Sequence, residues 1–199
     1  MNAHSPTLAT TLWPVEGRLA WLRSILLVVG GSLLLTLSAK IRVPIWEVPI
    51  TMQTFAVLLI GMAYGWRLGA ATVVAYLAQG LAGLPVFTNP GAGPAYLLGP
   101  TGGYLAGFVL AAAAVGWLAE RGWDRHLLTI VPTLIIGNVL IYVPGLVWLH
   151  QILVTADPAK DWATTLSLGV TPFLVGDALK LALAAALLPA AWKIIGRRG

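Results

Sequence analysis

Residues 172–195 read PFLVGDALKLALAAALLPAAWKII, and this stretch decides the fold class. It is long enough to cross a bilayer as a helix, which takes about 20 predominantly apolar residues. Two charged residues, Asp177 and Lys180, nevertheless lie three positions apart inside it. Residues at this spacing share one face of a helix. The stretch therefore predicts a membrane helix that carries an acid and a base on the same face.

The free-energy cost of these charges decides which way that face points. Two charges at the centre of a membrane helix cost about 5–7 kcal/mol on insertion scales. The ten large apolar residues between Phe173 and Ile195 return roughly 3–6 kcal/mol on the same scales. We therefore expect both charges to face the bundle interior or a water-filled cavity. They form either a buried structural ion pair or a polar ligand site, and we favour the ligand site because intramembrane ionisable groups are usually functional.

The composition of the whole chain agrees with a membrane protein. Of the 199 residues, 58% are hydrophobic and 10% are charged, whereas a soluble domain has about 25% charged residues. The net charge of +5 comes from basic residues scattered near helix ends, so it does not indicate a nucleic-acid partner. The absence of cysteine excludes disulfides and thiolate chemistry. The expected class is an all-α integral membrane protein.

Apolar segments predict six transmembrane helices in a single membrane domain spanning 1–199. Residues 1–21 and 196–199 are expected to be tails on either side of a bundle that occupies 22–195. The predicted spans are 22–40, 50–66, 68–84, 99–119, 127–149 and 172–195. Longer connections are expected at 41–49, 85–98 and 150–171, so the loop between the third and fourth helices is long.

The distribution of basic residues predicts the orientation, because cytoplasmic loops carry an excess of Lys and Arg. With the N-terminus inside, the inner side holds Arg18, Arg23, Arg67, Arg121, Arg125, Lys193, Arg197 and Arg198. The outer side then holds only Lys40, Arg42 and Lys160. Both termini are therefore expected in the cytoplasm, and Asp177 and Lys180 lie near the outer face.

Small residues repeat every four positions in several spans, a spacing that lets two helices approach closely. The clearest series is Gly99, Gly103, Gly107 and Ala111, and weaker series run through Gly61, Gly65, Gly69 and through Ala178, Ala182, Ala186, Ala190. These residues pack helices within the protein or dock a partner membrane protein. In the first span, we expect Ser32, Thr36 and Ala39 to form an outward docking face.

Enzyme and metal motifs do not appear in the sequence. The chain has no phosphate-binding loop of the G-x-x-x-x-G-K-[ST] type, no H-E-x-x-H and no C-x-x-C. Its three histidines, His4, His126 and His150, are too far apart in sequence to indicate a ligand cluster. A small membrane enzyme remains an unsupported alternative, and no metal site, cofactor or catalytic residue is expected.

Two stretches are expected to reach the outer side beside the charged pair. Residues 83–104 read GLPVFTNPGAGPAYLLGPTGGY, and their uncharged loop is apolar, which argues against disorder. We interpret it as a cap over an outward cavity rather than a plain connector. Residues 43–56 read VPIWEVPITMQTFA, where the Val-Pro pairs favour extended backbone before a helix. Here Thr51 or its neighbour can cap the helix, Gln53 and Thr54 are polar at its start, and Trp46 is either a pocket wall or an interfacial anchor.

Four motifs together resemble the BioY family, the substrate-binding membrane subunits of energy-coupling-factor (ECF) biotin transporters. They are VPITMQTFAVLL at 48–59, GLPVF at 83–87, LLGPTGGYLAGF at 97–108 and GDALKLALAA at 176–185. The similarity extends from about residue 25 to residue 190 in the family's order. It implies high-affinity biotin uptake across the cytoplasmic membrane by a six-helix S component with both termini inside. It also implies partners, namely a membrane T subunit docked on the first helix and two ATPase subunits, in addition to the lipid bilayer and a possible second copy.

The resemblance also implies which residues contact biotin. By motif these are Asn89 in the loop, the segment Gly99–Tyr104 with Thr101 and Gly102, and the pair Asp177 and Lys180. The chain departs from the family in having no Arg between 68 and 120 to hold the ligand carboxylate. Lys180, Lys40, Asn89 or the loop backbone would take that role.

The chemistry of a cyclic urea fits the charged pair, because a carboxylate accepts from N–H and an ammonium donates to C=O. We expect Asp177 to orient the ureido ring. An apolar wall of Trp46, Phe87, Tyr96 and Tyr104 would hold the thioether ring and the valeryl chain. An S component for another small vitamin is the nearest alternative.

Overall fold

The computed structural model describes residues 5–15, 17–43, 48–88 and 91–196. The longer helices are α2 (Ala20–Lys40), α3 (Gln53–Tyr64), α4 (Trp66–Leu81), α6 (Gly102–Ala119), α7 (Leu127–Ala156) and α9 (Leu174–Gly196). Shorter elements are α1 (Leu8–Leu12), η1 (Gly17–Leu19), α5 (Pro94–Leu97), α8 (Trp162–Gly169), η2 (Thr171–Phe173) and the strands β1 (Arg42–Val43) and β2 (Ile50–Thr51). The prediction of a mostly helical protein is confirmed.

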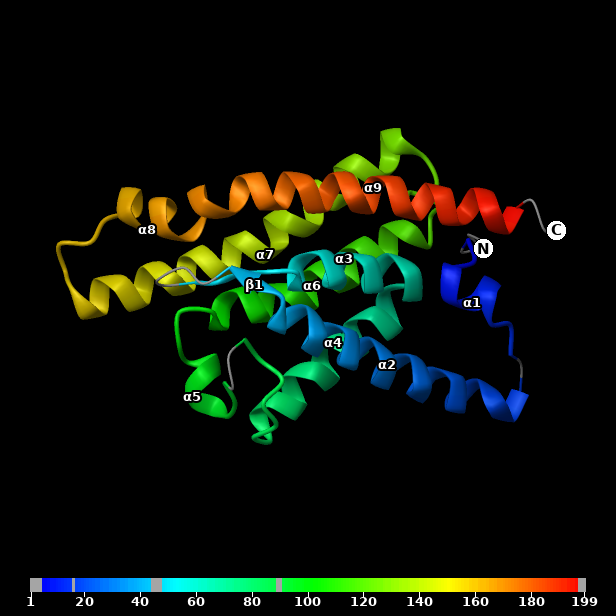
Figure 1. The fold of residues 1–199 in the computed structure, drawn as a ribbon, viewed down its shortest axis with the longest axis horizontal. Coiled ribbons are helices and arrows are strands. Elements are labelled where there is room, and N and C mark those ends of the chain that lie inside the picture. The colour runs from blue at the N-terminus through cyan, green and yellow to red at the C-terminus, as the bar shows by residue number, and fades with distance from the viewer. Residues whose placement is uncertain (1–4, 16, 44–47, 89–90, 197–199) are drawn as a thin grey trace.

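Helix α6 lies at the centre of the bundle and packs against α3, α4 and α7. Its buried face includes Leu105, Phe108, Ala112 and Val115. Helix α1 and the last turn of α9 lie at one end of the molecule, while α5 and α8 lie at the other end (Figure 1). The elements near the two chain ends therefore lie at the opposite end of the bundle from the elements expected around the site.

Close approach of α6 and α7 depends on the predicted glycine series. A Cβ atom added at Gly107 would lie 2.8 Å from the Cα atom of Ile141. A Cβ at Gly103 would collide with the carbonyl oxygen of Pro144. These glycines therefore pack helices within the protein. Gly99 precedes the helix, so only the later members of the series lie on α6.

The second and third predicted spans are shorter as helices than the sequence suggested. Helix α3 has 12 residues and α4 has 16, and Gly65 separates them with φ of +83°, a conformation that glycine adopts without steric cost. At 1.5 Å per residue, α3 is about 18 Å long. Within the described residues, four other stretches are long and apolar enough to cross a membrane: Gly17–Lys40, Gly102–Ala119, Leu127–Ala156 and Trp162–Ile195.

All three of the expected connections contain regular structure in their described residues. Helix α7 continues to Ala156, beyond the predicted end at 149, and α8 follows it within the expected 150–171 loop. The loop at 85–98 includes the one-turn helix α5. The extended backbone expected before α3 is confirmed as a short antiparallel ladder, in which Arg42 pairs with Thr51 and Val43 with Ile50.

The prediction that Ser32, Thr36 and Ala39 form an outward docking face on the first span is wrong. Ser32 and Ala39 are buried, and the Ser32 hydroxyl donates to Oε1 of Gln79 on α4 at 2.8 Å. Thr36 donates to the Ser32 carbonyl within α2. The reason is that two polar side chains in an apolar environment pair with each other, which turns this face of α2 inward. The alanine series on α9 from Ala178 to Ala190 is instead exposed.

Candidate ligand-binding site

A cavity lies between α3, α6, α7 and α9, beside the β1–β2 hairpin and the loop that follows α4. The space between the atoms is about 520 Å³, part of it open to the surroundings. Its lining is Val48, Pro49, Thr51, Gln53, Thr54, Thr88, Tyr96, Thr101, Tyr104, Leu105, Phe108, Ile141, Tyr142, Phe173 and Lys180. The lining is mostly apolar with a few polar groups, which is the usual pattern of small-molecule sites.

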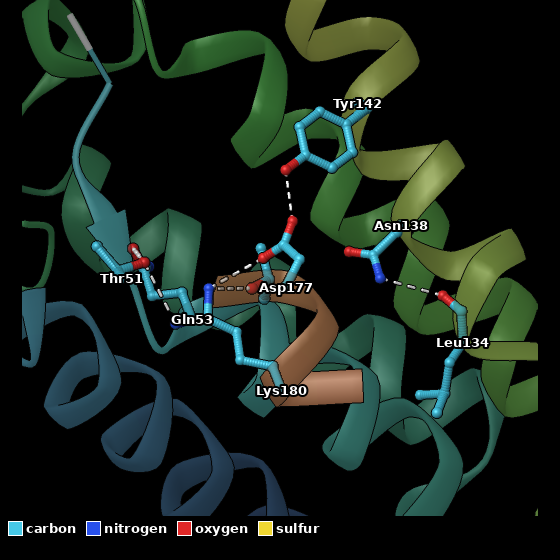
Figure 2. A network of polar contacts seen from close by, with 8 residues as sticks. Thr51, Gln53, Leu134, Asn138, Tyr142, Asp177 and Lys180 are labelled. Atoms are coloured by element: carbon cyan, nitrogen blue, oxygen red, sulfur yellow. Dashed lines mark hydrogen bonds and ion pairs between the residues drawn. The ribbon is translucent and has the colours of Figure 1, made fainter. Parts of the chain in front are cut away.

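The charged pair forms the polar centre of this site. Lys180 Nζ lies 3.1 Å from Asp177 Oδ1 and also donates to the Thr54 hydroxyl at 3.1 Å. The second carboxylate oxygen, Asp177 Oδ2, accepts a hydrogen bond from the hydroxyl of Tyr142 on α7. Figure 2 shows Tyr142 and Lys180 approaching the Asp177 carboxylate from opposite sides. Both oxygens of the buried carboxylate are thereby paired, as a buried charge requires.

Lys180, and not Asp177, is the member of the pair that lines the cavity. Asp177 instead borders a shallow apolar groove on the outer surface between α7 and α9, together with Tyr142 and Asn138. The Asn138 amide nitrogen donates to the Leu134 carbonyl, within α7 (Figure 2). The carboxylate therefore lies behind Lys180 as seen from the cavity, where it fixes the position of the ammonium group.

A second polar group enters the cavity from α3. Gln53 is buried, and its amide nitrogen donates to the Tyr76 hydroxyl at 2.8 Å. Its carbonyl oxygen accepts from the hydroxyls of Thr51 at 3.3 Å and Thr88 at 3.4 Å. Thr51 also accepts from the Gln53 backbone amide. The N-cap residue of α3 is Met52, which makes no side-chain cap hydrogen bond, so Thr51 contacts the first turn from one residue before the cap. This network joins the hairpin, α3, α4 and the loop after α4.

Aromatic side chains form the apolar wall. Tyr104 lines the cavity and donates to the Gly169 carbonyl at 3.0 Å, and its ring meets the edge of Tyr142 at 6.1 Å between centroids. Tyr96 also lines the cavity, while Phe87 stacks behind it at 4.7 Å. Phe173 completes the wall, and its ring centroid lies 6.5 Å from that of Tyr142.

The structure brings most of the predicted site residues together. Lys180, Gln53, Tyr96, Thr101 and Tyr104 line the cavity. Phe87 and Asp177 lie directly behind lining residues. Gly99 and Gly102 are among the described residues that do not line it; the Gly99 carbonyl accepts from Trp148 Nε1 at 2.9 Å, which fastens the turn before α6 to α7. Trp46 and Asn89 lie outside the described residues.

Sequence reasoning missed several lining residues, of which Tyr142 and Thr54 matter most. Tyr142 touches Asp177 and the cavity, but it lies in a long apolar span with no charge nearby in sequence. The signal that could have found it is its spacing from Asn138, because two polar residues four apart mark one face of a helix. Thr54 was noted as polar at the start of α3, and its contact to Lys180 was not anticipated.

The fold and the cavity define a multi-pass helical membrane protein with a small-molecule site near one end of the bundle. The BioY family model matches residues 7–197, and the chain belongs to the BioY family. Among relatives, the chain is 36% identical to "Probable biotin transporter BioY" of Pyrococcus horikoshii, over 76% of this chain and 85% of that protein. It is 33% identical to "Biotin transporter BioY2" of Lactococcus lactis subsp. cremoris, over 80% and 84%.

Another relative, "Biotin transporter BioY" of Thermotoga maritima, is 36% identical over 76% of this chain and 85% of its own length. The fold is similar to a solved structure described as the S-component for biotin from an ECF-type ABC transporter. That similarity has a TM-score of 0.76 at 22% sequence identity and covers 90% of this chain and 95% of the other.

Proposed function

We propose that this protein takes up biotin as the substrate-binding S component of an ECF transporter. The observation that carries the proposal is the position of Lys180, a cation held by Asp177 on the wall of a mostly apolar cavity. Membership in a family whose compared members are named as biotin transporters supports the same ligand. The transporter names also disfavour the membrane-enzyme alternative.

The cavity offers the groups that biotin requires. A ureido ring has one carbonyl acceptor and two N–H donors. The Lys180 ammonium would donate to the carbonyl, and the oxygens of Gln53 and the neighbouring threonines would accept from N–H. Asp177 would act on the ring through Lys180 and Tyr142, both of which it holds in place. This arrangement modifies the expectation that Asp177 itself contacts the ring.

The apolar side of the cavity would hold the rest of the ligand. Tyr96, Tyr104 and Phe108 are placed to contact the thioether ring and the valeryl chain. Asn89 and Trp46 remain proposed contacts from the sequence, and Thr101 lies on the wall near the start of α6. The ligand carboxylate would be held at the mouth of the cavity by the loop backbone or by Asn89.

The finer topology is part of the same proposal. The six longer helices would form one membrane domain over residues 22–195 in the cytoplasmic membrane, with both termini in the cytoplasm. The location of α1 and the end of α9 at the same end of the molecule supports this topology (Figure 1). A T subunit and two ATPases would energise transport.

Binding of tritiated biotin to the purified chain in detergent tests the proposal directly. We expect saturable binding that excess riboflavin or thiamine does not displace. Absence of binding, or displacement by either competitor, would contradict the assignment and favour an S component for another vitamin.

A further inference from the structure

Three consecutive backbone carbonyls at the start of the loop after α4 are held by side chains from other helices. Lys40, the last residue of α2, donates from Nζ to the carbonyl of Pro85 at 2.8 Å and to that of Phe87 at 2.6 Å. The carbonyl between them, on Val86, accepts from the hydroxyl of Tyr76 at 3.2 Å. Side chains from α2 and α4 thus fix the loop backbone from two sides.

The same stretch of loop carries side chains that shape the cavity. Thr88 lines the cavity and donates to Gln53 at 3.4 Å. Phe87 is fully buried, with its ring stacked on Tyr96 and set edge-on to Tyr76 at 5.5 Å between centroids. Displacement of this backbone would therefore move Thr88 and Tyr96 together, and with them one wall of the cavity.

Lys40 acts on this wall without being part of it. It is not among the described residues that line the cavity. Its ammonium group binds neutral carbonyls at the C-terminal end of α2, where the helix dipole favours a cation. A charged donor makes a stronger hydrogen bond than a neutral donor. The contact is also at the surface, so it can break and re-form without unfolding the core.

We propose that Lys40 is a positioning residue that holds residues 85–88 closed against the cavity and thereby sets the rate at which bound ligand escapes. The inference rests on the proposed function for the identity of the ligand. The sequence left open a direct contact between Lys40 and the ligand carboxylate, and the structure assigns the side chain to the loop backbone instead.

The test compares release rates of tritiated biotin from three purified variants and the wild type in detergent. Lys40→Met keeps the apolar stem and removes the donors, and we expect it to release biotin about tenfold faster, as loss of hydrogen bonds to a charged group implies. Lys40→Arg retains donors at similar reach, and its release rate should lie closer to the wild type. Arg42→Met is the matched control, because Arg42 is exposed two residues away and its loss removes the same charge.

The primary amide of biotin separates loop positioning from a direct contact with the carboxylate. If Lys40 acts through the loop, Lys40→Met accelerates release of the neutral amide as much as that of biotin. Acceleration confined to biotin would overturn the proposal, as would equal acceleration in Arg42→Met or in Lys40→Arg. A release rate for Lys40→Met within twofold of the wild type would also overturn it.

Tyr76→Phe provides a second variant, because it removes the hydroxyl that donates to the Val86 carbonyl. The same hydroxyl accepts from the Gln53 amide, so this variant tests the loop contact together with the position of Gln53. We expect it to accelerate release in the same direction as Lys40→Met, and an unchanged rate would count against the role of the loop. Failure of the wild type to bind biotin would refute the proposed function, whereas normal wild-type binding with unaffected Lys40→Met would refute this inference alone.

Discussion

Two buried aspartates meet α9 near its opposite ends, and they are held in different ways. Asp177 lies in the first turn, where Lys180 and Tyr142 pair with both of its oxygens. Asp124, in the turn between α6 and α7, accepts from Trp192 Nε1 at 2.6 Å, while its Oδ1 has no partner among the described residues. Fifteen residues of helix, about 22 Å, separate the two attachment points.

The difference shows which buried acid serves the ligand and which serves the fold. The Asp177 carboxylate is paired with a cation that reaches a cavity. Asp124 joins the end of α9 to the α6–α7 turn, and Arg125 stacks over the Trp192 ring at 4.4 Å while its guanidinium donates to the Pro6 carbonyl. Substitution of the first should therefore change ligand binding, and substitution of the second should change stability.

The largest expected effect on binding comes from Asp177→Asn. The amide keeps the shape of the side chain but leaves Lys180 without its counter-charge, and breaking a buried pair costs about 3–5 kcal/mol. We expect biotin affinity to fall by about 100-fold, or about 2.8 kcal/mol, because Lys180 is no longer held at the cavity wall. Isothermal titration in detergent measures it, and an affinity within threefold of the wild type would contradict the role assigned to the pair.

Tyr142→Phe removes the hydrogen bond to Asp177 and keeps the aromatic wall. We expect about tenfold weaker binding, since the carboxylate loses one of its two partners. Tyr64→Phe is the matched control, because Tyr64 is not among the lining residues. Equal affinities for the two variants would show that the Tyr142 hydroxyl does not act on the site.

Thr54→Val replaces a hydroxyl with a methyl group of similar size. Lys180 then loses one acceptor while the Asp177 pair remains, so we expect about fivefold weaker binding, the effect of one hydrogen bond of about 1 kcal/mol. Thr10→Val, at the opposite end of the molecule, should leave the affinity unchanged. A larger loss than in Tyr142→Phe would reverse the order of importance proposed for these contacts.

The smallest effect on binding, and the clearest effect on stability, is expected at Asp124. Burial raises the pKa of this carboxyl, while the hydrogen bond from Trp192 and the nearby Arg125 act in the opposite direction. The folded chain therefore keeps this proton to a higher pH than the unfolded chain, whose Asp titrates near about 3.9. Below that value the group costs nothing, and it becomes destabilising as the pH rises through the folded pKa.

Thermal unfolding in detergent between pH 4 and pH 7 tests this sign. The wild type should lose more thermal stability than Asp124→Asn as the pH rises over this range, because only the wild type has the buried carboxyl that must ionise. Asp124→Ala should unfold at a lower temperature at every pH, because Trp192 loses its acceptor. An identical pH dependence in the wild type and Asp124→Asn would show that Asp124 is not the titrating group.

The sequence was sufficient to predict that the charged pair on α9 is kept away from lipid, because the neighbouring apolar residues only marginally offset the cost of two exposed charges. Both side chains are largely buried, although only Lys180 lines the cavity, while Asp177 borders the groove between α7 and α9. It was not sufficient to predict Tyr142 or the length of α3. Tyr142 is separated from Asp177 by 35 positions, so only tertiary packing brings the two together. The end of α3 depends on the conformation of Gly65, which composition averaged over a span does not reveal.

The small-residue patterns also show what sequence periodicity can and cannot predict about helix packing. Periodicity predicted a closely packed helix face at Gly107, and the structure shows that α7 packs there. On α2 the same kind of pattern was assigned outward, yet Ser32 pairs with Gln79 inside the bundle. Spacing identifies residues that share a face, whereas the direction of that face depends on partners elsewhere in the chain.

The most direct measurement is a paired titration of biotin into Asp177→Asn and Asp124→Asn at pH 7, with the wild type alongside. Both substitutions replace a buried carboxyl group at α9 with an amide of the same shape. We expect Asp177→Asn to lose high-affinity binding and Asp124→Asn to bind like the wild type. Similar affinities for the two variants, whether both retained or both lost, would contradict the division between a ligand-binding and a structural aspartate.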